Sequence, residues 1–184
     1  MSNWVIDKEF HFEMGHRVWA QKLQHEHLSI STDCACKHLH GHSYSLKVFL
    51  GAEQLDQSQM VTDFKNLNFM KEFVDSVLDH KFMIDVNDPI FHGIVGINPK
   101  TYDVTHEPLF ANLGDVMRRL HTHSTGGECP MQVVWDSFVL VNFVPTSENI
   151  CKYLKQYAQD KIGDVATVTA VELWETKKSH CRYE

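Results

Sequence analysis

Two histidines separated by one residue, His40 and His42, begin a segment whose composition is typical of a β-strand. Side chains alternate along a strand, so we expect both imidazoles on the same face. Gly41 between them leaves room for a metal or ligand to approach the backbone. A catalytic zinc site takes three protein ligands and keeps one coordination position open, and we expect His16, just after the first predicted strand, to be the third ligand.

The metal-binding interpretation of this pair has an alternative, because two histidines on a strand can also be ordinary surface residues. The same spacing recurs at His25 and His27 and again at His121 and His123. Those two pairs fall in a predicted loop and at a predicted helix end, where solvent-exposed imidazoles are the simpler interpretation. The strand pair is therefore the better candidate for a metal centre.

Two cysteines, Cys34 and Cys36, lie a few residues before the histidine pair. A thiol close to a metal and an imidazolium has a lowered pKa, which makes it a better base or nucleophile. The alternative is a closed structural zinc site with cysteine ligands, which would need more clustered cysteines than are present here. The sequence therefore favours a reactive thiol at one of the two positions.

Two further positions carry groups suited to proton transfer or substrate binding. Asp79 precedes His80 at the predicted end of a helix, and a carboxylate can orient an imidazole for general acid-base catalysis. Glu175 lies in a strand that we predict to be largely buried, where a carboxylate needs a partner. That partner is either a cation of the protein or the amino-pyrimidine edge of a ligand.

The composition of the 184-residue chain is that of a globular protein and narrows its functions. The net charge is −7 and the lysines and arginines are scattered, so nucleic acid is not an expected partner. No apolar run approaches the roughly 18 residues of a membrane span, and the N-terminus lacks the pattern of a signal peptide. The five cysteines are expected to be reduced thiols. We therefore expect a cytoplasmic protein with no membrane partner.

The hydrophobic periodicity predicts an α+β fold in which two helices pack on one face of an antiparallel sheet. The first strand is expected to end at Gly15, and Thr146 is expected to be the N-cap of the last helix. We expect a single domain over residues 1–184, with a central insertion at about residues 86–131 that carries a helix. The predicted strands cover residues 4–12, 40–51, 133–143, 167–175 and 178–183, and a short extended piece covers residues 60–64. The predicted helices cover residues 66–80, 109–121 and a segment from 147 onward.

Six short blocks, taken together and in order, resemble the family of 6-pyruvoyltetrahydropterin synthases and 6-carboxytetrahydropterin synthases. They span nearly the whole chain apart from the central insertion, which stands where close relatives have a short loop. Six ordered blocks are far more specific than any one of them. The blocks are Phe12-x-x-Gly-His16-Arg17, Cys36-x-x-Leu-His-Gly-His42, Met60-Val-x-Asp-Phe64, Leu78-Asp-His-Lys-Phe82, Pro145-Thr-Ser-Glu-Asn149 and Trp174-Glu-Thr176.

The resemblance implies a tunnelling fold (T-fold), whose subunits join through their sheets into a homo-oligomer with the active site at a subunit interface. The implied oligomer is a hexamer. The resemblance also implies Zn²⁺ as the cofactor, with His16, His40 and His42 as its ligands. The implied substrate is a small-molecule pterin triphosphate, 7,8-dihydroneopterin triphosphate.

The resemblance assigns roles to the remaining candidate residues. Cys36 would be the catalytic thiol and would work with Asp79 and His80 of a neighbouring subunit. A carboxylate aided by two hydroxyl residues would anchor the pterin ring. The implied substrate-binding residues are Glu175, Thr146 and Ser147.

The spacing between the cysteine and the His-Gly-His motif bears on the product. Cys36 gives a Cys-x3-His-Gly-His spacing that resembles the 6-carboxy type, which we favour. This type is a zinc-dependent carbon-carbon or carbon-oxygen lyase that makes 6-carboxy-5,6,7,8-tetrahydropterin for queuosine and other 7-deazapurines and releases acetaldehyde and triphosphate. Cys34 gives a Cys-x5 spacing that resembles the 6-pyruvoyl type, which eliminates triphosphate. A non-catalytic, zinc-stabilised T-fold binding protein is the remaining alternative.

Overall fold

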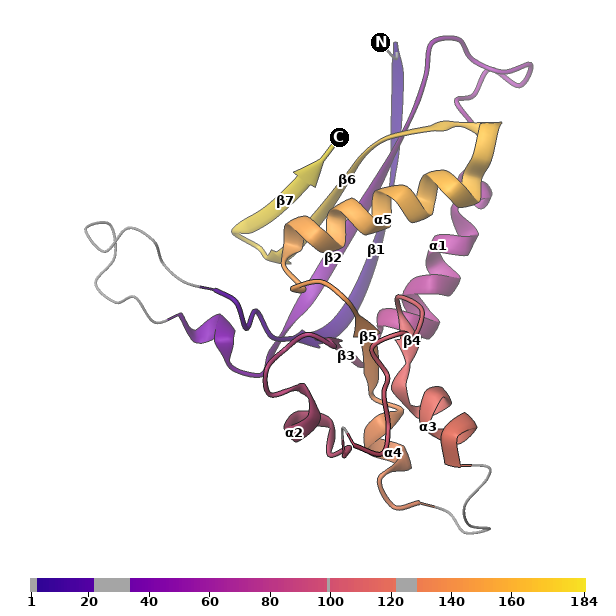
Figure 1. Ribbon diagram of the computed structural model, residues 1–184. Coiled ribbons are helices and arrows are strands. Elements are labelled where there is room, and N and C mark those ends of the chain that lie inside the picture. The colour runs from indigo at the N-terminus through magenta and orange to yellow at the C-terminus, as the bar shows by residue number, and fades with distance from the viewer. Residues whose placement is uncertain (1–2, 22–33, 99, 122–128) are drawn as a thin grey trace. The chain divides into compact units, whose positions relative to one another are not determined.

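The protein has an α+β fold built on a mixed sheet, which confirms the predicted fold class. The computed structural model describes residues 3–21, 34–98, 100–121 and 129–184. In that part of the chain the strands are hydrogen-bonded in the order β4-β5-β3-β1-β2-β6-β7 (Figure 1). No helix among these residues is both long enough and apolar enough to cross a bilayer. The contacts within the chain group into two compact units, of which the first is Met1–Glu13, His42–Asp79 and Thr146–Glu184 and the second is Met14–Gly41 and His80–Pro145.

The first two and the last two strands expected from the sequence are present in the structure. β1 (Trp4–His16) and β2 (His40–Ala52) both keep their even-numbered side chains on the more buried face. β2 pairs antiparallel with β6 (Thr167–Thr176), and β6 pairs antiparallel with β7 (Ser179–Tyr183). The predicted strands over residues 40–51, 167–175 and 178–183 are thus present close to their predicted bounds, whereas β1 is longer than predicted.

A composite helix fills the place of the helix predicted over residues 66–80. The piece predicted as extended over residues 60–64 is not a strand: Met60 and Val61 lie in a bend, and Asp63 has an extended backbone with φ −73° and ψ 133°. The Asp63 carboxylate accepts a hydrogen bond of 2.7 Å from the Lys65 N–H, so the helical turns start before residue 66. The composite consists of the 3-10 turn η3 (Phe64–Leu67), the α-helix α1 (Asn68–Phe73) and the wider π-helical turn η4 (Val74–Leu78).

The long helix α5 (Ser147–Ile162) begins where the sequence predicts. The Thr146 hydroxyl accepts a hydrogen bond of 3.3 Å from the Asn149 N–H, which is the geometry of an N-cap. The rings of Phe73 in α1 and Tyr157 in α5 lie 4.4 Å apart between their centroids. The two predicted helices of the first unit thus pack against each other through aromatic side chains.

The second unit contains parallel strand pairings that the sequence did not predict. β3 pairs in parallel both with the end of β1 and with β5. The expectation of antiparallel pairing holds for β2, β6 and β7 but is wrong for β3, because the long connection between β3 and β5 lets the chain return in the same direction. β4 pairs antiparallel with β5. These strands are β3 (Lys81–Asp85), β4 (Ala111–Asn112) and β5 (Phe138–Val141).

The prediction that the first strand ends at Gly15 is wrong, since β1 runs through Gly15 to His16. Gly15 lies opposite Phe82 in the pairing of β1 with β3. A Cβ atom at Gly15 would stand 2.4 Å from a ring carbon of Phe82, so the missing side chain is what allows β3 to lie beside β1. As a result His16 is held inside the sheet as the last residue of a strand.

The strand predicted over residues 133–143 is also shorter than expected. Helix α4 (Gln132–Trp135) occupies its first part, and β5 keeps only the four residues that are buried on both faces. Within α4, Val133 is 76% exposed, whereas Trp135 is buried and donates its indole N–H to the Val95 carbonyl over 2.9 Å. The apolar run therefore combines one helical turn with a short covered strand.

The segment at residues 86–131 contributes helices to an apolar core of the second unit. The helix predicted over residues 109–121 begins later, at the start of α3 (Leu113–His121), because Ala111 and Asn112 pair with β5 instead. A shorter helix, α2 (Phe91–Val95), precedes it. The buried members of this core are Ile84, Phe91, Val95, Ile97, Val104, Leu113, Val116, Met117, Trp135, Phe138 and Leu140.

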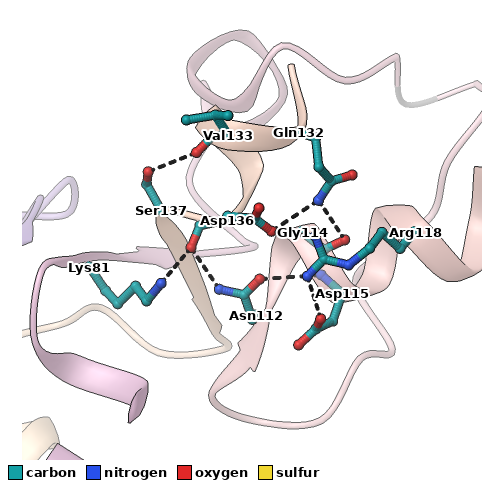
Figure 2. A network of polar contacts seen from close by, with 9 residues as sticks. All are labelled: Lys81, Asn112, Gly114, Asp115, Arg118, Gln132, Val133, Asp136 and Ser137. Atoms are coloured by element: carbon teal, nitrogen blue, oxygen red, sulfur yellow. Dashed lines mark hydrogen bonds and ion pairs between the residues drawn. The ribbon is translucent and has the colours of Figure 1, made fainter. Parts of the chain in front are cut away.

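A polar network around Asp136 joins the helices of this segment to the strands (Figure 2). The Asp136 carbonyl accepts hydrogen bonds from Lys81 Nζ at 2.7 Å and from Asn112 Nδ2 at 2.9 Å. Its carboxylate accepts from Arg118 at 2.8 Å and from Gln132 at 3.0 Å. Partial desolvation acts to raise the pKa of Asp136, but the hydrogen bonds from Gln132 and Arg118 outweigh it and the pKa is lowered. The lowered pKa means that Asp136 takes part in this network as an ionised carboxylate.

Gly114 leaves the space that this network occupies, which predicts the cost of filling it. A Cβ atom at Gly114 would lie 1.8 Å from Asp136 Oδ1, so Gly114→Ala must displace the carboxylate from its partners. We expect a loss of about 1–2 kcal/mol in the free energy of unfolding, measured by urea denaturation. Gly93→Ala in α2 is the control, because nothing lies within 4 Å of its added Cβ. Equal stability of the two variants would contradict the prediction.

Candidate metal centre

Three histidines converge where β1 ends and β2 begins. His16 is the last residue of β1 and is 1% exposed, and the centroid of its ring lies 4.5 Å from that of His40, the first residue of β2. His42 follows two residues later in the same strand, so its side chain leaves the same face as that of His40. One ring nitrogen from each histidine lies within 4.8 Å of the others. The structure therefore brings together the three residues that the sequence proposed as metal ligands.

Two backbone carbonyls fix the ring orientation of two of these histidines, His16 and His40. The Nδ1 atom of His16 lies 2.7 Å from the Pro145 carbonyl oxygen, and Nδ1 of His40 lies 2.8 Å from the His38 carbonyl oxygen. A carbonyl can only accept, so in both contacts Nδ1 carries the proton and Nε2 keeps its lone pair. An Nδ1–H donated to a carbonyl is the usual support behind a metal-binding imidazole. The supporting carbonyls could not be identified from the sequence.

The donor set fits a metal with an open coordination position. The Nε2 atoms of His16 and His40 are buried, and neutral imidazole nitrogens suit zinc and other late first-row divalent metals. Three protein ligands leave room for a water molecule or a substrate oxygen at a fourth position. A metal held by these three histidines would be able to polarise an oxygen atom of a bound molecule. Of the alternative pairs, His25, His27 and His123 lie outside the described residues.

The two cysteines near the histidines lie on a short turn. The 3-10 turn η2 (Ala35–Lys37) carries Cys36, Cys34 precedes it, and both thiols are half-buried. The pKa of the Cys34 thiol is lowered, first by a hydrogen bond from the backbone N–H of Cys36 and then by one from the Cys36 side chain. The turn therefore makes the Cys34 thiol more acidic than an ordinary cysteine.

The predicted acid-base pair lies where η4 ends and β3 begins. The Asp79 carboxylate accepts a hydrogen bond of 2.9 Å from the backbone N–H of Glu13 in β1. His80 has a φ of 55°, in the left-handed region that non-glycine residues seldom adopt. Such backbone strain persists where the surrounding structure enforces it, and it is frequent at functional sites.

The predicted substrate-binding residues belong to the first unit. Glu175 is half-buried near the end of β6, a strand in which most residues are buried or half-buried. The Thr146 hydroxyl accepts from Asn149, which leaves its own proton for another acceptor. Ser147 is the first residue of α5, where the helix dipole and the unbonded backbone N–H groups favour an acceptor group.

The fold and the histidine cluster define a T-fold protein, and comparison with known proteins places the chain in a family. Residues 5–184 match the family model described as 6-pyruvoyl tetrahydropterin synthase. The chain therefore belongs to the 6-pyruvoyl tetrahydropterin synthase family, as its sequence blocks suggested. It is 30% identical to a 6-carboxy-5,6,7,8-tetrahydropterin synthase of Aquifex aeolicus, over 98% of both chains. It is 26% identical to one of Haemophilus influenzae, over 97% of both chains.

Solved structures confirm the predicted T-fold. An uncharacterized protein from Wolinella succinogenes matches with a TM-score of 0.82 and 38% identity, over 98% of this chain and 97% of that one. The 6-pyruvoyl tetrahydropterin synthase of Caenorhabditis elegans matches with a TM-score of 0.55 over 98% of this chain and 94% of its own. The second match, at 19% identity, supports the fold alone.

The histidine cluster predicts that the folded protein binds a divalent metal through His40. With Zn²⁺ as the probe, we expect one ion per chain by elemental analysis, and a gain of about 2.7 kcal/mol in unfolding free energy at a free-metal concentration of 100 times Kd. His40→Ala should lose both the metal and the stabilisation. His11→Ala is the matched control, because His11 is also in a strand but is exposed and has the opposite parity. Retention of wild-type zinc content in His40→Ala would rule out this centre.

Proposed function

We propose that this protein is a zinc-dependent 6-carboxy-5,6,7,8-tetrahydropterin synthase that acts on 7,8-dihydroneopterin triphosphate. The observation that carries the proposal is the match over nearly the full chain to curated relatives of that name from two organisms. The cluster of His16, His40 and His42 supports it, because it supplies the metal centre that such an enzyme needs. The reaction consumes water and yields the 6-carboxy product, acetaldehyde and triphosphate, which makes the enzyme a lyase of the route to queuosine and other 7-deazapurines.

The reacting groups in this proposal are a metal, a thiol and an imidazole. Zinc held by the three histidines would act as a Lewis acid towards oxygen atoms of the substrate side chain. Cys36 would take a proton from one side of that side chain, and His80, oriented by Asp79, would exchange a proton on the other side. We propose that Asp79 and His80 come from a neighbouring subunit of a homo-oligomer, expected to be a hexamer.

Recognition of the pterin ring would fall to residues of β6 and α5. Glu175 presents a carboxylate that can accept two N–H groups from the amino-pyrimidine edge. The Thr146 hydroxyl has a proton to donate, and Ser147 adds a second hydroxyl at the same helix end. A carboxylate and two hydroxyls together can match the alternating donors and acceptors of such a ring.

We also propose a cytoplasmic location and a single functional domain. All five cysteines are thiols and not disulfides, as is usual for a reducing compartment. The segment at residues 86–131 would be an addition to the T-fold domain and not a separate domain, since its helices share a core with residues of β3 and β5.

A second candidate, 6-pyruvoyltetrahydropterin synthase activity, is favoured by one observation. The pKa of Cys34 is lowered through the hydrogen bonds from Cys36, and Cys34 has the spacing that resembles the 6-pyruvoyl type. A thiolate at Cys34 would then be the base of a triphosphate elimination. The two candidates differ in product and in the cysteine that carries the reaction.

Product analysis separates these two activities. We expect zinc-loaded protein to convert 7,8-dihydroneopterin triphosphate into 6-carboxy-5,6,7,8-tetrahydropterin and acetaldehyde, both detected by mass spectrometry after derivatisation. Accumulation of 6-pyruvoyltetrahydropterin without acetaldehyde would establish the second candidate instead. No turnover at any metal loading would leave a non-catalytic binding protein as the explanation.

Cysteine variants identify the catalytic thiol. We expect Cys36→Ala to lower kcat by at least about 100-fold, because the proton-transfer group is lost. Cys34→Ala is the matched control in the same turn and should keep kcat within about tenfold of wild type. The reverse pattern would assign the reaction to Cys34.

A further inference from the structure

A buried ion pair lies directly behind the turn that carries Cys36. Arg17, the residue after His16, contacts the Asp88 carboxylate through its NH1 group. The side chain of Asp88 is 0% exposed and that of Arg17 is 16% exposed. A buried carboxylate is strongly unfavourable without a partner, so this pair holds the Arg17 guanidinium in one place. Asp88 belongs to the segment that follows β3 and has no counterpart among the six sequence blocks.

The other side of Arg17 holds the cysteine turn. Arg17 Nε donates a hydrogen bond of 2.6 Å to the Lys37 carbonyl. The backbone N–H of Val18 donates to the Cys36 carbonyl over 2.9 Å. The carbonyls of Cys36 and Lys37 are therefore fixed by Val18 and Arg17, the two residues that follow His16. These contacts tie the thiol-bearing turn to the strand that ends in a metal-ligand candidate.

The loop that carries Asp88 is itself rigidly built. Asp88 Oδ1 accepts from the Ile90 N–H at 3.0 Å, and the Asp88 N–H donates to the Asp85 carbonyl at 3.0 Å. Asp85, which is also buried, accepts from the indole N–H of Trp19 at 2.8 Å and from the Asn87 N–H at 2.9 Å. The carboxylates of Asp85, at the end of β3, and of Asp88, in the loop after it, thus hold two side chains of the segment that follows His16.

We propose that Arg17 and Asp88 are positioning residues for the Cys36 thiol, an inference that rests on the proposed function of Cys36. The planar guanidinium presents its NH1 and Nε donors in a fixed fork, so its bond to Asp88 aims Nε at the Lys37 carbonyl. A lysine at this place can pair with Asp88 but cannot hold both acceptors in that geometry. The start of the 86–131 segment therefore acts on catalysis through the turn and not through contact with substrate.

The test compares variants that keep the charge balance of the pair. Arg17→Lys retains a cation beside Asp88, and the double variant Arg17→Gln with Asp88→Asn removes both charges together, so neither leaves a buried carboxylate alone. For both variants of the zinc-loaded protein we expect kcat to fall by about tenfold or more, because small displacements of a reacting group are costly. KM should stay within about threefold of wild type, since substrate binding groups are untouched.

A second readout does not depend on turnover. Iodoacetamide alkylation of Cys36 at fixed pH, located by tandem mass spectrometry, should become about threefold faster or more when the turn loses its anchor. Arg119→Lys is the matched control, because it alters an Arg–Glu107 contact in the same unit without touching the turn. It should leave both kcat and the alkylation rate unchanged.

The outcomes separate this inference from the proposed function. Folded Arg17 variants with a wild-type alkylation rate at Cys36 would overturn the positioning role, whether or not kcat changes. Faster alkylation together with wild-type kcat would overturn it as well, because a displaced turn would then have no catalytic consequence. If the wild-type protein turns over no pterin triphosphate but the Arg17 variants are alkylated faster at Cys36, the anchoring of the turn is supported. Only the proposed function is then refuted.

Discussion

The hydrogen bond from His16 Nδ1 to the Pro145 carbonyl is the contact on which the site depends. It spans 129 residues of sequence and measures 2.7 Å. It sets the tautomer of a buried imidazole, so the lone pair must lie on Nε2, the atom that can reach a metal. The same contact joins the end of β1 to the residue just before the N-cap of α5. One carbonyl, 129 residues away in the sequence, thus sets the orientation of this metal-ligand candidate.

The sequence predicted the parts of the fold that follow from local periodicity. β1, β2, β6 and α5 have one buried face each, so apolar residues recur at the period of the element and reveal it. The prediction failed where tertiary packing decides. Gly15 could not be recognised as a close-contact position, because the Phe82 ring that requires it comes from another strand. The run from Val133 was ambiguous because a helical turn and a buried strand can both consist of consecutive apolar residues.

The candidate site also contains residues that local sequence could predict and residues that it could not. The pairing of His40 with His42 is a local fact of strand geometry and could be predicted from spacing alone. The choice of His16 gained support from the order of the sequence blocks, and the structure brings its ring to His40. The Asp88 carboxylate and the carbonyls of Pro145 and His38 carry no recognisable signal, because any residue supplies a carbonyl and loops often contain aspartate. These supporting groups are set by the fold, and only coordinates reveal them.

The two thiols of the cysteine turn, Cys34 and Cys36, are linked by hydrogen bonds. Cys34 accepts hydrogen bonds from both the backbone and the side chain of Cys36, and this lowers the pKa of Cys34. The two thiols therefore cannot be considered separately, since the Cys36 thiol is one of the groups that lower the pKa of Cys34. The Cys-x3 and Cys-x5 spacings before the His-Gly-His motif thus begin at two cysteines that are hydrogen-bonded to each other. Under the proposed function, one cysteine of the pair would react and the other would shift its pKa.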